Sequence, residues 1–180
     1  ESVVSAETSD ITEANDASTG ELVINGTAAE GQTLTLDTSD IADENGLGTF
    51  SHVWIKDGEV LTGETGSTYT LSQGDVGSVF TASVNFVDGL GGTETVAADP
   101  TATVVNVNDD PTGSLTLSGT VEKGSTLTLD SSTIADEDGL GDFTFTWLVD
   151  GAEITGAAGR TFTLTADEVG KAVSAEISYT

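Results

Sequence analysis

Apolar and polar residues alternate along several short segments of the chain. Threonine alternates with leucine in QTLTLD (32–37) and STLTLD (125–130), and with aromatic residues in STYTL (67–71) and FTFTW (143–147). Apolar residues alternate with small polar ones in VFTASVNF (79–86). Because successive side chains of a strand point to opposite faces of a sheet, this period of two predicts strands that are buried on one face.

Dipeptides that favour tight turns separate these segments. Each combines Asn or Asp with glycine, which accepts the positive φ that such turns need. They are Asn25-Gly26, Asp57-Gly58, Asp88-Gly89 and Asp150-Gly151. No segment of the chain has the 3.6-residue apolar period of a helix. The pattern therefore predicts an all-β protein built of short strands.

The chain repeats itself at an offset of 93 residues. Residues 15–87 align with residues 108–180 without a gap, and about 34 of the 73 pairs are identical. A period of this length indicates tandem domains, since it is too long for one turn of a solenoid. We therefore predict two tandem immunoglobulin-like β-sandwich domains, residues 15–107 and 108–180. In this division the second domain lacks its last strand.

A tryptophan in the middle of one strand of each repeat favours the immunoglobulin-like fold. Trp54 and Trp147 stand where this fold has its core tryptophan, and a D/E-V-G turn follows each of them, similar to the turn before the sixth strand of that fold. The chain departs from the fold's usual pattern because it has no cysteine, and because Val79 and Ala172 replace a usual tyrosine. We expect both tryptophans to pack in the domain cores.

The charge of the chain restricts its partners. There are 31 acidic residues against 4 basic ones, and the formal net charge is −27. Nucleic acids and anionic membrane surfaces are excluded as partners, because both are bound through basic faces. No apolar stretch reaches the roughly 18 residues of a membrane-spanning helix. The charge favours hard cations that prefer oxygen ligands, calcium above all.

One acidic phrase occurs in each repeat, as IADENGLG (41–48) and IADEDGLG (134–141). The segment that leads into the second repeat, NDDP (108–111), is also acidic, and its counterpart begins at Asn15. In an immunoglobulin-like topology the repeated loop lies at the end of the domain where the chain enters. Carboxylates that are forced together must pair, take up protons or bind a cation. We therefore predict a calcium site beside each of these segments.

The predicted calcium ligands form two sets. Those of the second repeat are Asn108, Asp109, Asp110, Asp136 and Asp138, with Asp75 approaching from the preceding domain. Those of the first repeat are Asp16, Asp43, Asn45 and Asp88. The loops lack the glycine and glutamate spacing of an EF-hand, and DGLGGTET (88–95) does not match the calcium-binding nonapeptide of β-rolls. The alternative is that these loops are solvated turns on an acidic surface.

Several motifs of the chain resemble the tandem immunoglobulin-like repeats of giant bacterial surface adhesins of the RTX type. They are the N-D-x-P linker, the D-G-L-G loop, the W-x-x-D-G turn and the D/E-V-G turn. The linker is also similar to the calcium linker of cadherins. The resemblance implies a structural extender, stiffened by calcium between neighbouring repeats and located outside the cell on a bacterial surface. The alternative, from another class, is a calcium-dependent carbohydrate-binding module of the cadherin-like kind.

No set of residues in the chain has the pattern of a catalytic site. His52 is the single histidine, and its counterpart in the second repeat is Phe145. No carboxylate pair lies in an apolar segment, as a general acid and base would. Aromatic residues that match between the repeats lie in alternating segments, so we expect them in the cores: Tyr69 and Phe162, and Phe86 and Tyr179. The sequence therefore predicts that the protein is not an enzyme.

Residues 1–14 align at the same offset with residues 94–107, which we expect to supply the last strand of the first domain. We therefore predict that residues 1–14 are the equivalent of the last strand of a preceding repeat. Two explanations for this first segment remain open. Each domain begins with such a strand, or residues 1–14 of one copy complete the second domain of another copy by strand exchange.

Overall fold

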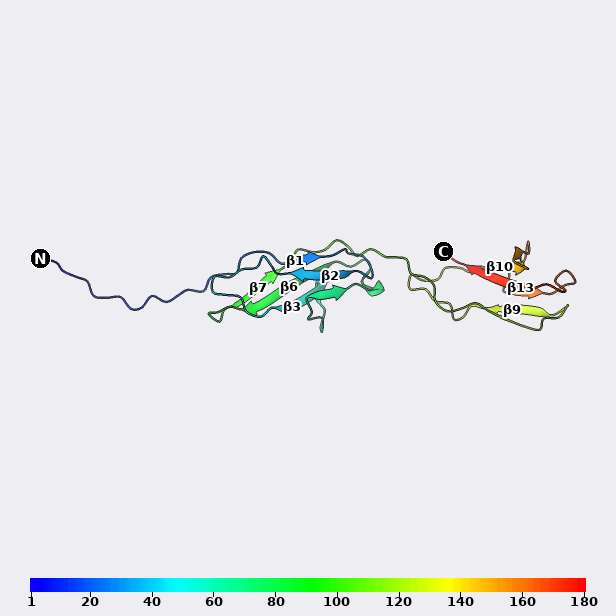
Figure 1. The fold of residues 1–180 in the computed structure, drawn as a ribbon, viewed down its shortest axis with the longest axis horizontal. Coiled ribbons are helices and arrows are strands. Elements are labelled where there is room, and N and C mark those ends of the chain that lie inside the picture. Colours follow the sequence, from blue (N-terminus) through cyan, green and yellow to red (C-terminus); the bar gives the residue numbers. More distant parts are fainter. The chain divides into compact units, whose positions relative to one another are not determined.

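The computed structural model describes residues 1–180, which form two compact units, Glu1–Val107 (unit 1) and Asn108–Thr180 (unit 2) (Figure 1). The division falls where the repeat pattern places the start of the second domain. The sheets of both units are antiparallel. The only helix is a single 3-10 turn, η1 (Gln73–Asp75), so the chain has no helix that could cross a membrane.

Unit 1 contains two sheets, with strand orders β1-β2-β5 and β4-β3-β6-β7. The strands of the first sheet are β1 (Val23–Asn25), β2 (Thr33–Asp37) and β5 (Thr68–Thr70). Those of the second sheet are β4 (Glu59–Val60), β3 (Ser51–Lys56), β6 (Phe80–Val87) and β7 (Thr93–Ala97). Two antiparallel sheets with this order make an immunoglobulin-like β-sandwich, so the predicted fold class is confirmed.

The core of unit 1 joins side chains from both sheets. Leu34 of β2 packs with Trp54 of β3 and with Phe80 and Val84 of β6, and each is at most 1% exposed. Burial of such a side chain contributes about 1.5–3 kcal/mol. The Trp54 indole N–H donates to the Gly66 carbonyl (2.9 Å), which satisfies its one polar atom. The prediction that Trp54 packs in the core is confirmed.

The chain leaves unit 1 along a segment that changes its partner. After β7 the chain still follows β6 toward its start, and the Val104 N–H donates to the Ser78 carbonyl (2.9 Å). The Val105 N–H then donates to the Ala28 carbonyl (3.0 Å), in a parallel bridge between Val105 and Ala29. Val104 is 2% exposed, so this segment completes the core as well as the sheet.

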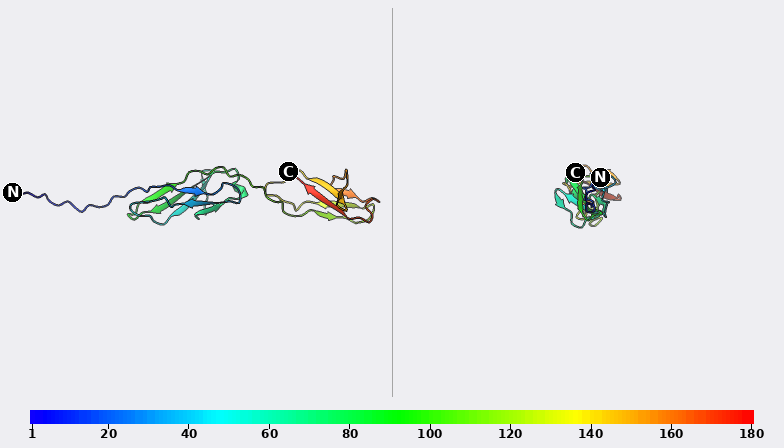
Figure 2. Two further views of the ribbon diagram at one scale, coloured as in Figure 1. Left: turned by 45° about the horizontal axis from the view of Figure 1, so that its top comes forward. Right: turned by 90° about the vertical axis from the view of Figure 1, so that its left-hand side faces the viewer.

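Unit 2 contains a sheet of order β8-β9-β12 and a sheet of order β11-β10-β13, which lie in separate layers (Figures 1 and 2). The strands of the first sheet are β8 (Thr116–Ser118), β9 (Thr126–Asp130) and β12 (Thr161–Thr163). Those of the second sheet are β11 (Ala152–Glu153), β10 (Thr144–Val149) and β13 (Val173–Ser178). Trp147 of β10 is fully buried and donates its indole N–H to the Gly159 carbonyl (2.8 Å), as Trp54 does in unit 1.

β13 is an edge strand. It pairs with β10 alone, whereas its counterpart in unit 1, β6, lies between β3 and β7. The side chains of β6 that face the core are buried, but the matching side chains of β13 are only partly buried. The residues that would match β7 at the repeat offset fall after residue 180.

Two Asp-Gly dipeptides form the tight turns that the sequence predicts. Asp57 lies between β3 and β4 with a φ of 50°, and Asp150 lies between β10 and β11 with a φ of 48°. The glycine that follows each aspartate also has a positive φ, as a two-residue hairpin turn requires. Asp57 Oδ1 in addition accepts the Val79 N–H (2.8 Å), which fixes the turn to the start of β6.

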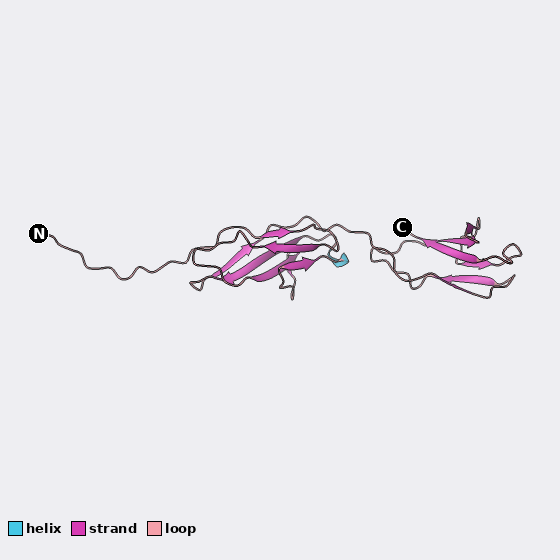
Figure 3. Ribbon diagram, viewed as in Figure 1, coloured by secondary structure: helices cyan, strands magenta, loops and turns pink.

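Residues 1–14 form no strand and pair with neither sheet of unit 1 (Figure 3). Their large apolar side chains are almost fully exposed: Val3 by 99%, Val4 by 87% and Ile11 by 95%. Residues 1–14 therefore contribute no strand to unit 1 in this structure. The chain joins the sandwich at Thr19, which pairs with Ala42 through backbone hydrogen bonds of 2.7 and 2.9 Å.

Candidate metal centre

The repeated acidic loop of unit 1 turns at Asp43. Its Oδ1 accepts the Asn45 N–H (2.8 Å), and its carbonyl accepts the Gly46 N–H (3.1 Å). Gly46 has a φ of 96°, which a residue with a side chain adopts only with strain. This turn uses one carboxylate oxygen of Asp43, while the other, Oδ2, is buried without a hydrogen-bond partner.

The loop between β6 and β7 places a second carboxylate at the same end of unit 1. Asp88 directly follows β6 and is 6% exposed. Its Oδ1 accepts the N–H groups of Leu90 (2.8 Å) and Gly92 (2.9 Å), whereas its Oδ2 is buried without a partner. The Gly89 N–H donates to the Asn45 carbonyl (3.1 Å), so the two acidic loops are joined directly.

Glu94 of β7 completes what we call the Asp43 cluster, which consists of Asp43, Asp88 and Glu94. One carboxylate oxygen of each residue lies within 4.8 Å of those of the other two. Two of these three carboxylates, Asp43 and Asp88, each have one buried oxygen that lacks a hydrogen-bond partner. A buried acceptor without a donor costs about 1–3 kcal/mol, and more when it is charged, while neighbouring carboxylates also repel one another. A cation between these oxygens would remove both costs.

The segment that leads into unit 1 is fastened to the same residues. The Asp16 N–H donates to Asn45 Oδ1 (2.7 Å), and the Ser18 hydroxyl donates to Glu94 Oε2 (3.2 Å). Asn45, predicted as a calcium ligand, thus uses its side-chain oxygen to hold this segment. The Asp16 side chain is exposed, and with Asp43 it lines a shallow hollow at this end of the unit.

Asn15 brings a neutral oxygen to the Asp43 cluster. A side-chain carbon placed on Gly92 would collide with Asp88 Oδ2 and would lie 2.7 Å from Asn15 Oδ1, so both oxygens border the same small space. Three carboxylates and an amide, with no sulfur and no imidazole, make a hard donor set. Calcium takes 6–8 such oxygens at about 2.3–2.6 Å with flexible geometry, and water molecules can supply the remainder.

Replacing Gly92 by alanine is expected to weaken cation binding by about 10–100-fold while the fold is kept, because the new methyl group fills the space beside Asp88. The φ of Gly92 is not positive, so its backbone accepts alanine, but the side chains of Asp88 and Asn15 must move to admit the methyl group. Calcium titration by calorimetry measures the effect. Gly66→Ala is the matched control, since its methyl group meets only the Thr68 backbone at 3.4 Å. Equal affinities for the two variants would contradict this placement of the ion.

Unit 2 repeats the loop geometry. Asp136 Oδ1 accepts the Asp138 N–H (2.9 Å), and Asp138 Oδ2 accepts the Asp109 N–H (2.8 Å). These bonds match those of Asp43, Asn45 and Asp16 in unit 1. The Asn108 amide donates to the Asp109 carbonyl (2.9 Å), as the Asn15 amide does to Asp16. Asp110 is exposed beside Asp136 and borders a hollow there.

One residue changes the chemistry of this second loop. The Tyr179 hydroxyl, in the place of the Phe86 side chain of unit 1, donates to Asp136 Oδ2 (2.6 Å). This hydrogen bond, with lesser effects of burial and of the charges of Asp136 and Asp138, raises the pKa of Tyr179 to about 12. The carboxylate oxygen Oδ2 therefore accepts a hydrogen bond in Asp136, whereas Oδ2 of Asp43 has no hydrogen-bond partner. The counterparts of Asp88 and Glu94 fall after residue 180, so the complete cluster is described in unit 1 alone.

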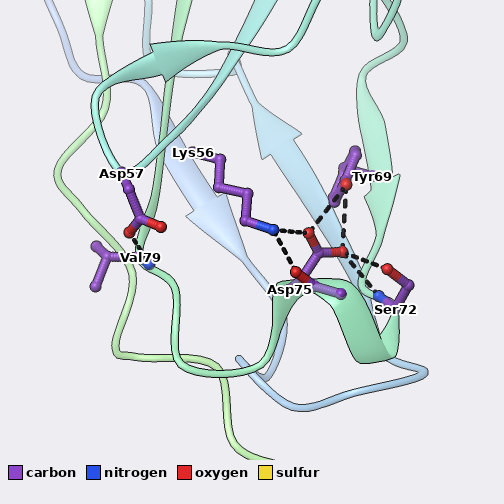
Figure 4. A network of polar contacts seen from close by, with 7 residues as sticks. Lys56, Asp57, Tyr69, Ser72, Asp75 and Val79 are labelled. Carbon is purple, nitrogen blue, oxygen red and sulfur yellow. Dashed lines mark hydrogen bonds and ion pairs between the residues drawn. The ribbon is translucent and has the colours of Figure 1, made fainter. Parts of the chain in front are cut away.

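Asp75, predicted as a cation ligand, is instead engaged inside unit 1 (Figure 4). Its Oδ1 pairs with Lys56 Nζ (2.7 Å), and its Oδ2 accepts hydrogen bonds from the Ser72 N–H and hydroxyl, both at 2.9 Å. The Tyr69 hydroxyl also donates to Oδ2 (3.2 Å). Asp75 is 3% exposed, so a counterion from within the unit replaces the cation that the sequence suggested.

This network shifts two pKa values. Burial alone would raise the pKa of Asp75, but the hydrogen bonds from Lys56 and Ser72 outweigh it and lower that pKa below its ordinary value. Burial and the neighbouring Asp75 carboxylate raise the pKa of the Tyr69 hydroxyl. Both groups are therefore held in the forms that the network needs, a carboxylate that accepts and a phenol that donates.

The sequence did not identify two side chains at the site, nor the ion pair between Lys56 and Asp75. Glu94 and Asn15 were not among the predicted ligands, although Glu1 recurs at the repeat offset from Glu94 and could have drawn attention to it. The ion pair of Lys56 left no signal, because the second repeat has Val149 at the matching position.

Comparisons with known proteins add little to this picture. No family model matches the chain, and no curated protein matches it. Among solved structures, the chain is similar to one described as the central fibronectin-III array of RIM-binding protein, with 12% identity and a TM-score of 0.25. The match covers 91% of this chain and 64% of that one, so this chain spans less than two thirds of its length. The fold, tandem immunoglobulin-like β-sandwiches, is shown by the sheets of the chain itself.

Proposed function

We propose that the chain is a pair of structural repeats that bind calcium where the chain enters each sandwich, and that the ion stiffens the chain at these points. One observation carries the proposal. Asp43 and Asp88 each hold a buried carboxylate oxygen that has no hydrogen-bond partner, and a carboxylate oxygen of Glu94 lies within 4.8 Å of an oxygen of each. A solvated acidic turn, the alternative reading of this loop, would leave such oxygens exposed to water.

The effect of the ion follows from what surrounds it. Asn15 borders the cluster, and the next residues of the incoming segment are bonded to Asn45 and Glu94. An ion at the cluster would hold this segment against the end of the sandwich, where hydrogen bonds alone hold it without the ion. In unit 2 the Asp109–Asp138 bond fastens the corresponding segment in the same way. A tandem array in which an ion holds the incoming segment against each sandwich would act as a spacer. The proposal includes no catalytic step.

The motif resemblance supports the finer proposal that the parent protein is a bacterial surface adhesin of the RTX type, with these repeats as extracellular extenders. Extracellular calcium modules bind at about 10⁻⁴–10⁻³ M, which suits sites open to the medium. The carbohydrate-binding alternative has less support. Sugar-binding sites need an exposed aromatic face, and none of the aromatic side chains of the chain is exposed. Phe86, which leads to Asp88, is packed against Phe50 at 5.3 Å between ring centroids.

Thermal melting and small-angle scattering of the whole chain, in calcium and in chelator, test the proposal. Calcium at one hundred times its Kd should stabilise unit 1 by about 2.7 kcal/mol. That free energy corresponds to a rise in Tm of roughly 10–20 °C for a domain of this size. Magnesium at the same concentration is the control and should give a smaller rise, because it demands near-ideal octahedral geometry.

The two measurements separate the two parts of the proposal. An unchanged Tm in calcium and in chelator would contradict calcium binding. A raised Tm with an unchanged scattering profile would agree with calcium binding but would contradict the stiffening of the chain by the ion.

A further inference from the structure

The acidic loop of unit 1 contains one of the two Asn-Gly pairs in the chain. They are Asn45-Gly46 in that loop and Asn25-Gly26 at the end of β1. An asparagine before a glycine is open to deamidation, because glycine has no side chain to keep its backbone nitrogen away from the asparagine amide carbon. A side-chain carbon placed on Gly46 would meet nothing within 4 Å, so the surroundings of the pair leave room for the reaction.

The reaction at this pair needs no partner other than water. The Gly46 backbone nitrogen attacks the side-chain amide carbon of Asn45, the bond from that carbon to Nδ2 breaks, and ammonia leaves with the proton of the Gly46 N–H. The succinimide ring that results takes up water and opens to aspartate, or to isoaspartate, in which the main chain runs through the side-chain carbon. Nδ2, which leaves, is buried without a hydrogen-bond partner, so no acceptor retains it.

Both reacting groups are held in place while the loop is closed. The Gly46 N–H donates to the Asp43 carbonyl (3.1 Å), and the Asn45 side-chain oxygen accepts the Asp16 N–H (2.7 Å). The Asn45 carbonyl also accepts the Gly89 N–H (3.1 Å). The attack requires the Gly46 nitrogen and the Asn45 amide to leave these hydrogen bonds, so the reaction depends on local opening of the loop.

Two carboxylates of the Asp43 cluster lie on the segments that hold the pair. Asp43 accepts the Gly46 N–H, and Asp88 directly precedes Gly89 in the chain. An ion bound to both carboxylates would keep the two segments together. Without the ion the carboxylates repel one another, and the open loop is more populated.

We propose, on the basis of the calcium binding proposed above, that Asn45-Gly46 is a deamidation site that the bound ion protects. In calcium the loop stays closed and Asn45 is preserved. When calcium is withdrawn, the pair reacts. The isoaspartate product has a longer main chain, which cannot keep the hydrogen bonds to both Asp16 and Gly89, so chains that carry it lose the site permanently.

Incubation of the whole chain well below its Tm, in calcium and in chelator, tests the proposal when peptide mass spectrometry follows both Asn-Gly pairs. Calcium at one hundred times its Kd should slow the deamidation of Asn45 about 100-fold, because the population of the open loop falls by that factor. Asn25 is the internal control. It pairs with Thr35 in the register of β1 and β2, so its rate should be the same in both conditions.

Two variants connect the protection to the cluster. Gly92→Ala, which is expected to weaken calcium binding, should lose most of the protection of Asn45 at the same calcium concentration. Gly66→Ala is the matched control and should keep it. Equal Asn45 rates for the two variants in calcium would contradict protection by an ion at this cluster.

Calorimetry of the chain after incubation in chelator measures the consequence of the modification. The number of calcium sites should fall by the fraction of chains that carry isoaspartate at position 45. A full number of sites in the modified chains would contradict the loss of binding.

The rates separate this proposal from the proposed function. An Asn45 rate that is equal in calcium and in chelator would overturn the protection. If the Tm still rises in calcium, the calcium site stands, whereas an unchanged Tm would contradict the proposed function as well. Equal slowing of Asn45 and Asn25 by calcium would also overturn the proposal, because the ion would then act on the whole unit and not on this loop.

Discussion

Asp88→Asn is expected to melt above the wild-type chain in chelator and below it in calcium. Without an ion, the substitution removes one of three carboxylates that repel one another at the Asp43 cluster. The asparagine side-chain oxygen can still accept the backbone N–H groups of Leu90 and Gly92, so the loop should keep its conformation. With calcium present, the variant lacks a charged ligand and should lose most of the roughly 2.7 kcal/mol that a saturating ion adds.

Differential scanning calorimetry of the variant and the wild-type chain, in chelator and in calcium, measures this reversal in the order of their melting temperatures. Asp99→Asn is the matched control, because Asp99 is an exposed carboxylate of the same unit. The control removes the same charge from the chain as a whole, so it accounts for any general effect of net charge. If Asp88→Asn and Asp99→Asn respond alike to calcium, the ion does not bind at Asp88.

Lys56→Met is expected to destabilise unit 1 by about 3 kcal/mol. Removing one partner of a buried ion pair costs about 3–5 kcal/mol, and the lower value applies because the Lys56 side chain is 24% exposed. The loss leaves the Asp75 carboxylate buried without its counterion. It should lower the Tm of unit 1 by roughly 12–24 °C, which calorimetry measures. Lys171→Met, which removes an exposed lysine of unit 2, should change the Tm of unit 1 little.

The pH dependence of stability gives a second signature of the same pair. The pKa of Asp75 in the folded protein lies below its ordinary value of 3.8, so its contribution is present above that value and is lost as the pH falls through the folded pKa. In Lys56→Met the burial of Asp75 would raise its pKa, and acid destabilisation should begin at a higher pH than in the wild type. An unchanged acid profile would contradict a structural role for the pair.

The strands of both units could be predicted because each depends on a local pattern. The segments around Leu34, Trp54 and Phe80 alternate with period two, and all three form strands whose apolar face is buried. The repeat offset then gave the division into two units, since a duplicated pattern folds twice in the same way. The aspartate-glycine turns at Asp57 and Asp150 were equally predictable, because few residues other than glycine tolerate a positive φ.

The site was less predictable because it depends on distances between segments far apart in the sequence. The acidic loop identified Asp43, and charge density suggested a cation. The contribution of Glu94 depends on the register of β7 against β6, which no local pattern reveals. Asp75 has the composition of a calcium ligand, but Lys56 neutralises it from a strand 19 residues away. Net charge is a property of the whole chain, so it cannot show which carboxylate forms an ion pair with one of the few lysines.

The way in which the chain leaves unit 1 determines how the unit bears load. The segment near its exit runs parallel to the segment near its start, through bridges of Leu22 with Ala98 and of Ala29 with Val105. A pull on the two ends of the unit therefore draws these parallel segments past each other along their length. Their hydrogen bonds lie across the direction of force, so they must break together rather than one after another. A sandwich closed in this way resists extension by shear, which is the mechanical property that a spacer under tension requires.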